Sequence, residues 1–345
     1  MERNAPGAYW ESKTPVELGM SGDELSRVER WLHDSASGEP YRALVIRHGC
    51  IAAEWNHGMS ADEKIPQASA GKSLYSCLLG IAVSEGRIPG LDARVFDYYP
   101  EMMDVGEGEG PKAGRYSFEK DRDITFRQLI GNTSGYMKPG EEPGKHFHYQ
   151  TFGMNVITNS LATIYGLYDS SEPDSLPGCG ILIQQKIRDV LGGTWEYTYG
   201  DFEHPPGARK NIFGHSLSIL STARDAARMA QLWLNGGNWN GVQVVPSDYL
   251  REATATNSNI IANEPERRWR YGMGFWVNDY GKQWPKLPRD SFAAWGGGAR
   301  HIWASPELDL IVVLNPAPWA KLRNEKDRLE REEDALYRIV NAVND

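Results

Sequence analysis

The sequence has few cysteines, no long apolar run and no excess of positive charge. Its three cysteines, Cys50, Cys77 and Cys179, are widely separated and have no CxxC pair or clustered histidine beside them. We therefore expect buried free thiols in place of a disulfide scaffold or a zinc site. No stretch approaches the roughly 20 apolar residues that span a bilayer. The formal net charge of −9 argues against nucleic acid or an anionic membrane surface as a partner.

The first residues lack the apolar segment of a signal peptide. The stretch MERNAPGAYWESKTPVELG contains no such region, so the sequence as written predicts a cytoplasmic protein. A signal trimmed from the chain would instead make it periplasmic or secreted. With 40% hydrophobic residues in 345, the chain can bury a sizeable core in two lobes or one large domain. We expect small-molecule partners, and the sequence leaves the oligomeric state open.

The stretch QASAGKSLYSCLLGIAVSEG contains the first candidate catalytic residues. Leu74, Leu78 and Ile81 recur at helical spacing, which predicts an amphipathic helix that begins at Ser69. A spacing of three places the Lys72 amine on the same face as the Ser69 hydroxyl, where it can activate a serine without histidine. Taken alone, the pair more often means a capping serine and a solvated lysine.

A second informative stretch surrounds Tyr149. A short helix capped at Thr125 ends in the loop 131–135, and a further helix follows Tyr149. A phenol at the junction of loop and helix can point into a cleft and exchange protons with an amine. The alternative is a buried ring with a satisfied hydroxyl. His146 and His148 form a His-x-His pair without a third ligand at suitable spacing, so no metal site is predicted.

Other segments have readable patterns. The spacing of apolar residues predicts a hairpin that turns at His48-Gly49 and helices over 19–38, 180–193 and 323–345. The acidic, glycine-rich segment 102–123 is interpreted as a surface excursion. An aromatic loop follows the helix at 180–193, and its rings either shape an apolar pocket or pack on one another. These rings belong to Trp195, Tyr197, Tyr199 and Phe202.

Three segments together resemble the serine β-lactamase-like hydrolase family. SAGKS, ITFRQLIGNTSGY and EPGKHFHYQTFGMNVI follow one another in the order of the family's motifs. Near the end, AAWGGGARHIWASPELDLIVVLN is similar to the hairpin that carries the family's third motif. The family includes class C β-lactamases, D-alanyl-D-alanine carboxypeptidases and family VIII esterases. The resemblance extends from about residue 20 to about residue 340 and is far more specific than any single motif.

The resemblance implies an α/β fold of the β-lactamase/transpeptidase type. Residues 1–80 and 236–345 would form an antiparallel sheet flanked by helices, and residues 81–235 a mostly helical lobe. The active site would lie in the cleft between the two lobes, where pockets commonly form.

The resemblance also implies a mechanism without metal or cofactor. Ser69 would attack a carbonyl carbon, and Lys72 and Tyr149 would pass its proton to the leaving group. Water would then hydrolyse the acyl-enzyme. The Ser69 N–H and an N–H of the glycine-rich strand would hold the oxyanion. The substrate-binding positions are Thr151, Trp295, Gly296, Gly297 and Gly298.

Departures from the family pattern narrow the range of substrates that we expect. Trp295-Gly296-Gly297 stands where penicillin-recognising members commonly have Lys-Thr-Gly, and Thr151 stands in place of the usual asparagine. Arg300 and His301 lie just beyond this triplet and would be the nearest groups to supply a positive charge for a substrate carboxylate. The alternative is that each is simply an exposed strand residue. We therefore expect a serine hydrolase of carboxylic esters, with small amides as a second class. The alternatives are a D-amino-acid peptidase or amidase, a weak β-lactamase, and a non-catalytic penicillin-binding-like sensor.

Overall fold

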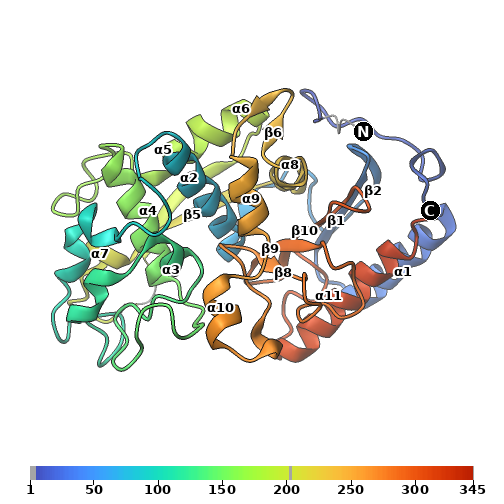
Figure 1. Ribbon diagram of the computed structural model, residues 1–345. Coiled ribbons are helices and arrows are strands. Elements are labelled where there is room, and N and C mark those ends of the chain that lie inside the picture. Colours follow the sequence, from blue (N-terminus) through green and yellow to red (C-terminus); the bar gives the residue numbers. More distant parts are fainter. Residues whose placement is uncertain (1–4, 202–203, 345) are drawn as a thin grey trace.

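The structure is a computed structural model that describes residues 5–201 and 204–344. Its largest element is a six-stranded sheet with the strand order β2-β1-β11-β10-β9-β8, each strand antiparallel to its neighbours. The strands are β1 (Tyr41–Arg47), β2 (Cys50–His57), β8 (Trp276–Val277), β9 (Phe292–Gly296), β10 (Arg300–Ser305) and β11 (Leu310–Leu314). Because β11 pairs with β1, segments from the two ends of the chain build one sheet (Figure 1). The predicted α/β fold with an antiparallel sheet is confirmed.

The hairpin of β1 and β2 turns where the sequence predicts. His48 and Gly49 have φ values of 53° and 73°, the left-handed conformation that a two-residue hairpin turn requires. Alternate β1 residues then face opposite layers: Ala43 and Val45 belong to one core cluster, and Leu44 and Ile46 to the other. The sheet is therefore buried on both faces.

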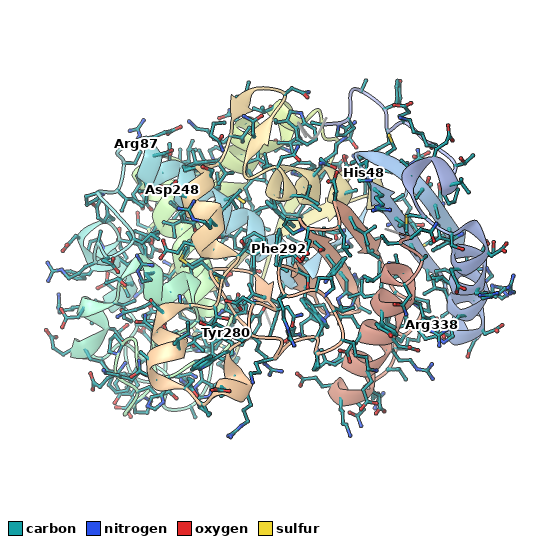
Figure 2. The ribbon with its side chains drawn as sticks, turned by 45° about the vertical axis from the view of Figure 1, so that its right-hand side comes forward. His48, Arg87, Asp248, Tyr280, Phe292 and Arg338 are labelled. Carbon is teal, nitrogen blue, oxygen red and sulfur yellow. The ribbon has the colours of Figure 1, made fainter. Side chains whose placement is uncertain are left out.

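Helices from both ends of the chain cover one face of this sheet. Figure 1 shows α1 (Gly22–Ala36) and α11 (Glu325–Val340) side by side on it. The Ser21 and Asn324 side chains cap the two helices. Helix α8 (Ala223–Leu234) packs on the opposite face, against β1, β10 and β11. In Figure 2, Arg338 of α11 and Arg87, just after α2 (Lys72–Ser84), lie at opposite ends of the molecule.

The middle of the chain is mainly helical. Its helices are α3 (Phe126–Ile130), α4 (Phe152–Ile164), α5 (Cys179–Ile183), α6 (Asp189–Leu191) and α7 (Lys210–Phe213), with a π-helical turn over Gln184–Arg188. Two further helices, α9 (Ser247–Ala253) and α10 (Ser258–Asn263), and the small hairpin β6 (Asn238–Trp239) and β7 (Val242–Gln243) precede β8. No helix in the described ranges is long and apolar enough to cross a membrane. The division of the chain at residues 80 and 236 stays a prediction.

Two expectations about this region are wrong. The aromatic segment after residue 195 is not a loop, since β4 (Glu196–Asp201) pairs with β5 (His215–Ser221), which also pairs with β3 (Ile65–Pro66). Helix α2 is not amphipathic in its environment, because every residue from Lys72 to Ala82 is buried. The three cysteines are free and buried, as expected.

Candidate active site

Ser69 lies in the tight turn that leads into α2. The 3₁₀ turn Ala68–Gly71 begins with Ala68 at a φ of 49°, a left-handed conformation that is uncommon for a residue other than glycine. Ser69 is the second residue of this turn, is half-buried, and does not cap α2, whose N-cap position is Gly71. The α-helix therefore begins at Lys72, three residues after the predicted Ser69, and the alternative of a capping serine is excluded. The turn leaves the hydroxyl beside the first turn of α2.

Lys72 connects the predicted catalytic groups. Its Nζ lies 3.0 Å from Ser69 Oγ and 2.8 Å from Tyr149 Oη, and it also lies 3.3 Å from Thr151 Oγ1. The side chain is buried, and no described carboxylate lies within 4 Å of it. An ammonium has three donors, so these three hydroxyl oxygens satisfy it completely. The solvated lysine that the motif alone favours is excluded.

Tyr149 is held at the edge of this site by its ring and by its backbone neighbours. The ring stacks on Trp276 at 5.7 Å between centroids and meets the edge of Tyr271 at 5.8 Å. Asn132, in the loop 131–135, accepts from His148 N–H through its carbonyl at 2.8 Å and from Gln150 N–H through Oδ1 at 2.9 Å. Asn132 thus fixes the residues on both sides of Tyr149, a role that the sequence did not indicate.

The glycine-rich strand lies against the Ser69 turn. A Cβ on Gly296 would come 2.2 Å from the carbonyl oxygen of Gln67, so only glycine lets β9 approach the turn this closely. Trp295 and Gly296 end β9, whereas Gly297 and Gly298 form the turn to β10, where Gly298 has a φ of 74°. This placement brings backbone next to Ser69. The oxyanion role of these residues stays a prediction.

His301 is not available as a charge for the substrate. Its Nε2 accepts a hydrogen bond of 3.1 Å from Trp295 Nε1, and its Nδ1 lies 3.2 Å from Glu332 Oε1, at an angle that does not make a hydrogen bond. Glu332 also accepts from Trp284 Nε1 at 3.2 Å. His301 is 2% exposed. It therefore supports Trp295 from within the core and is neither a substrate cation nor an exposed strand residue.

Arg300 remains close to the glycine turn. Its Nη1 donates to the Gly297 carbonyl at 2.8 Å, and no carboxylate of the described residues lies within 4 Å of the guanidinium. Burial lowers the pKa of Arg300 from its ordinary value. A partly desolvated guanidinium without a carboxylate partner is able to bind an anion beside the turn between β9 and β10.

Beyond Tyr149 and Thr151 the structure contains a cavity of about 740 Å³. Lys112, Arg115 and Lys138 line it together with these two residues. This cavity was not predicted, because residues 102–123 were interpreted as a surface excursion. A signal was nevertheless present: two cations, at 112 and 115, follow the glycine-rich run without an adjacent acid.

The other residues considered for the site lie elsewhere or have other partners. His148 forms an ion pair with Glu141 at 2.8 Å, and no group of three or more metal-binding side chains occurs among the described residues. Trp195 is fully buried, and Tyr199 donates to the carbonyl of Pro177 and accepts from Gly180 N–H. The rings of Tyr197 and Tyr199 pack on one another, with 5.5 Å between their centroids, and Phe202 lies outside the described residues.

Comparison with known proteins agrees with this geometry. The sequence model described as Beta-lactamase matches residues 41–335. The chain is 22% identical over 320 residues to the 6-aminohexanoate-dimer hydrolase of Paenarthrobacter ureafaciens. The matched region covers 86% of this chain and 77% of that protein.

Solved structures share the fold. A putative β-lactamase from Bacteroides dorei superposes with a TM-score of 0.67 at 15% identity, covering 93% of this chain and 99% of that chain. A family VIII carboxylesterase gives a TM-score of 0.61 at 16% identity, with the same coverage of 93% and 99%.

Proposed function

The chain belongs to the β-lactamase family of hydrolases, and from that premise we propose that it cleaves carboxylic esters, and small amides, through an acyl-enzyme on Ser69. One observation carries the proposal: Lys72 Nζ is within hydrogen-bond distance of both Ser69 Oγ and Tyr149 Oη. A nucleophile, its proton acceptor and a second proton carrier thus form one chain of contacts. The site uses no metal in this scheme.

The reaction proceeds in two halves. Ser69 Oγ attacks the carbonyl carbon while its proton passes to the Lys72 and Tyr149 pair, whose reacting atoms are 2.8 Å apart. To accept this proton, the pair must together hold one proton fewer than an ammonium and a phenol, as an ammonium beside a phenolate does. The same pair then delivers the proton to the leaving alkoxide or amine as the bond to the carbonyl carbon breaks. Water then attacks the acyl-enzyme and gives one proton to the pair, which returns a proton to Ser69 Oγ as the bond to the acyl group breaks and the acid leaves. The geometry supports both transfers because Lys72 contacts nucleophile and phenol at once.

We assign stabilisation of the oxyanion to backbone N–H groups. The N–H of Ser69 and an N–H at the end of β9 would point at the developing negative charge. The close approach of Gly296 to the Ser69 turn supports this assignment. Gly297 leaves room for substrate, since a Cβ on it would meet nothing within 4 Å, whereas the space beside Gly298 is filled by Arg300 Nη1.

Residue chemistry favours an ester over a penicillin. Trp295 stands in place of a strand lysine and its Nε1 is bound to His301. Thr151 presents a hydroxyl, which contacts Lys72, where the family commonly has an amide for the acylamino group of penicillins. Structural likeness does not decide between the two substrates, because the putative β-lactamase from Bacteroides dorei and the family VIII carboxylesterase both share the fold.

Arg300 supports a second candidate function. An unpaired guanidinium beside Gly297 could hold the carboxylate of a D-amino-acid peptide, an amide or a β-lactam. A non-catalytic sensor is the least supported candidate, because Ser69, Lys72 and Tyr149 are all present and in contact.

Intact-protein mass spectrometry separates these candidates. Wild type and Ser69→Ala are each mixed with a short-chain nitrophenyl ester, a β-lactam and a D-alanyl peptide, and turnover is measured in parallel. We expect an adduct and turnover with the ester in wild type and neither in Ser69→Ala. The change should alter the free energy of unfolding by no more than about 1 kcal/mol, because one hydrogen bond is lost.

Ser84→Ala, at the other end of α2, is the matched control and should behave as wild type. Ester hydrolysis by Ser69→Ala at the wild-type rate would refute Ser69 as the nucleophile. A faster reaction with the β-lactam or peptide would favour the Arg300 candidate, and a stable adduct without turnover would favour the sensor.

A further inference from the structure

The cavity beside the catalytic groups is lined by positive charge. Its lining includes Tyr149 and Thr151 together with Lys112, Arg115 and Lys138, and no aspartate or glutamate is part of its described lining. Tyr149 and Thr151 each contact Lys72, so the cavity adjoins the reacting atoms. This collection of cations contrasts with the net charge of −9 for the whole chain.

Arg115 has most of its donors unused. The side chain is half-buried, and its Nη1 makes a long hydrogen bond of 3.4 Å to the carbonyl of Met137. No carboxylate of the described residues lies within 4 Å of it. A guanidinium has five N–H donors in a planar fork that matches a carboxylate. Arg115 is therefore able to bind an anion without giving up an existing ion pair.

Lys138 is the more deeply buried cation. It is 5% exposed, and its nearest anion, Glu141, lies 3.5 Å away. Glu141 is shared with His148, which it approaches to 2.8 Å. Burial lowers the pKa of Lys138 to about 8, with Arg115 acting in the same direction. One shared carboxylate thus compensates this group of cations only in part.

We propose that this cavity is a subsite for a carboxylate of the substrate, held by Arg115 and Lys138 with Lys112 at the rim. The inference rests on the proposed function and names its substrate class: esters or amides that bear an acid group a few bonds from the reacting carbonyl. The subsite differs from the position beside Gly297, because Arg300 does not line the cavity.

The test uses two pairs of esters that differ only in charge. In the first pair, mono-4-nitrophenyl adipate is compared with its methyl ester, which places the acid on the acyl group. In the second, 4-acetoxybenzoate is compared with methyl 4-acetoxybenzoate, which places it on the leaving group. The cavity can receive the acid from only one of these two positions. In that pair, we expect kcat/KM of the wild type to be at least about tenfold higher for the acid than for its methyl ester.

Variants assign this preference to the cavity. Arg115→Gln and Lys138→Gln should each reduce the preference by about tenfold, because kcat/KM for the acidic ester falls much more than kcat/KM for the neutral ester. Lys138→Arg keeps the charge and should keep the preference. Lys326→Gln, which removes an exposed cation from α11, is the matched control and should have no effect. Melting temperatures confirm that each variant is folded.

Calorimetric titration with glutarate separates this proposal from the proposed function. Binding to wild type and to Ser69→Ala that is lost in Arg115→Gln supports the subsite even if no ester is hydrolysed. Ester turnover through Ser69 with no preference for either acid and no binding of glutarate would keep the function and overturn the subsite. A preference that survives both glutamine variants would also overturn it.

Discussion

At the scale of single residues, the site depends on how one buried ammonium is satisfied. Lys72 has three donors and contacts three hydroxyl oxygens, two of them from the segment that leads into α4. Ser69 and Tyr149 are thereby held in contact with the same nitrogen. The Ser-x-x-Lys spacing predicts the first of these contacts, but the second depends on the packing of residues far apart in sequence.

Tyr149→Phe should lower kcat for the nitrophenyl ester by about 10²–10⁴-fold, because in the proposed reaction the phenol carries the proton in both halves. Its ring contacts with Trp276 and Tyr271 do not involve the hydroxyl, so the melting temperature should change little. Steady-state kinetics and thermal melts measure both. Tyr280→Phe, at an exposed tyrosine, is the control, and a wild-type rate in Tyr149→Phe would remove Tyr149 from the mechanism.

Gly296→Ala should both destabilise the fold and reduce activity. The added Cβ would lie 2.2 Å from the Gln67 carbonyl oxygen, so β9 and the Ser69 turn must separate, at a cost of about 1–3 kcal/mol. Gly297→Ala introduces the same atom into open space and should leave the melting temperature nearly unchanged. Chemical denaturation measures the difference, and equal stability of the two variants would contradict the close approach described above.

At the scale of elements, α2 shows what periodicity can and cannot predict. Its apolar residues recur at helical spacing, as the sequence indicates. Its polar residues are nevertheless buried as well. Hydrogen bonds satisfy them there: Ser73 donates to the Gly274 carbonyl at 2.7 Å, and Ser76 pairs with the Tyr249 hydroxyl at 2.8 Å. These partners lie far along the chain, so local sequence cannot distinguish a buried polar face from a solvated one.

Gly80→Ala in α2 tests this packing. Alanine favours helix over glycine by about 1 kcal/mol, but here its Cβ would meet the Tyr249 ring of α9 at 2.6 Å. We expect net destabilisation on the order of 1–2 kcal/mol in denaturant unfolding. Gly90→Ala, which meets nothing within 4 Å, should change stability by less than about 0.5 kcal/mol. A more stable Gly80→Ala protein would mean that α9 is not packed this closely.

The strand β4 shows the opposite error, a regular element interpreted as a loop. Tyr197 pairs with Ile219 and Tyr199 with Leu217 across β4 and β5. The alternation of tyrosine with polar residues was a strand signal, but the neighbouring prolines and glycines favoured a loop. The segment is a strand because it pairs with β5, about twenty residues later in the chain.

At the scale of the whole molecule, charge is distributed unevenly. An acidic protein collects Lys112, Arg115 and Lys138 around one cavity, and these residues come from two separate segments. Composition alone argued against anionic partners such as nucleic acid, and it could not reveal a small cationic site. The folded arrangement is what makes an acidic small molecule a suitable ligand.

This charge predicts a pH dependence. Lys138 is protonated below its pKa of about 8, so the preference for the acidic ester should be complete near pH 7 and fall as pH rises through about 8. kcat/KM reports groups of the free enzyme and is the quantity to measure. Lys138 faces Glu141, Arg115 and Arg268, and the two arginines stay charged in this range.

Two variants check the assignment of this pH dependence. Lys138→Arg should abolish the fall, because arginine remains charged. His148→Gln removes the other titratable group that contacts Glu141 and should leave the fall in place. If His148→Gln abolished the fall and Lys138→Arg did not, the titrating group would be His148.

The fold and the site were predictable to different extents. The hairpin of β1 and β2 and the helix α11 follow from local patterns, because their partners are near in sequence or their faces are clearly polar and apolar. The pairing of β1 with β11 followed only from the family resemblance, since no local pattern specifies it. The cationic cavity was missed because its walls come from loops that have no regular spacing.

The position of β11 between β1 and β10 also has a consequence for how the protein is made. Pairing between strands so distant in sequence forms late, because a long loop must first be closed. A growing polypeptide contains Ser69 and Lys72 long before Leu314 leaves the ribosome. Until then β11 is missing between β1 and β10, and β9, which lies against the Ser69 turn, lacks the support of the completed sheet. We therefore expect the proposed hydrolysis to begin only after β11 has been inserted.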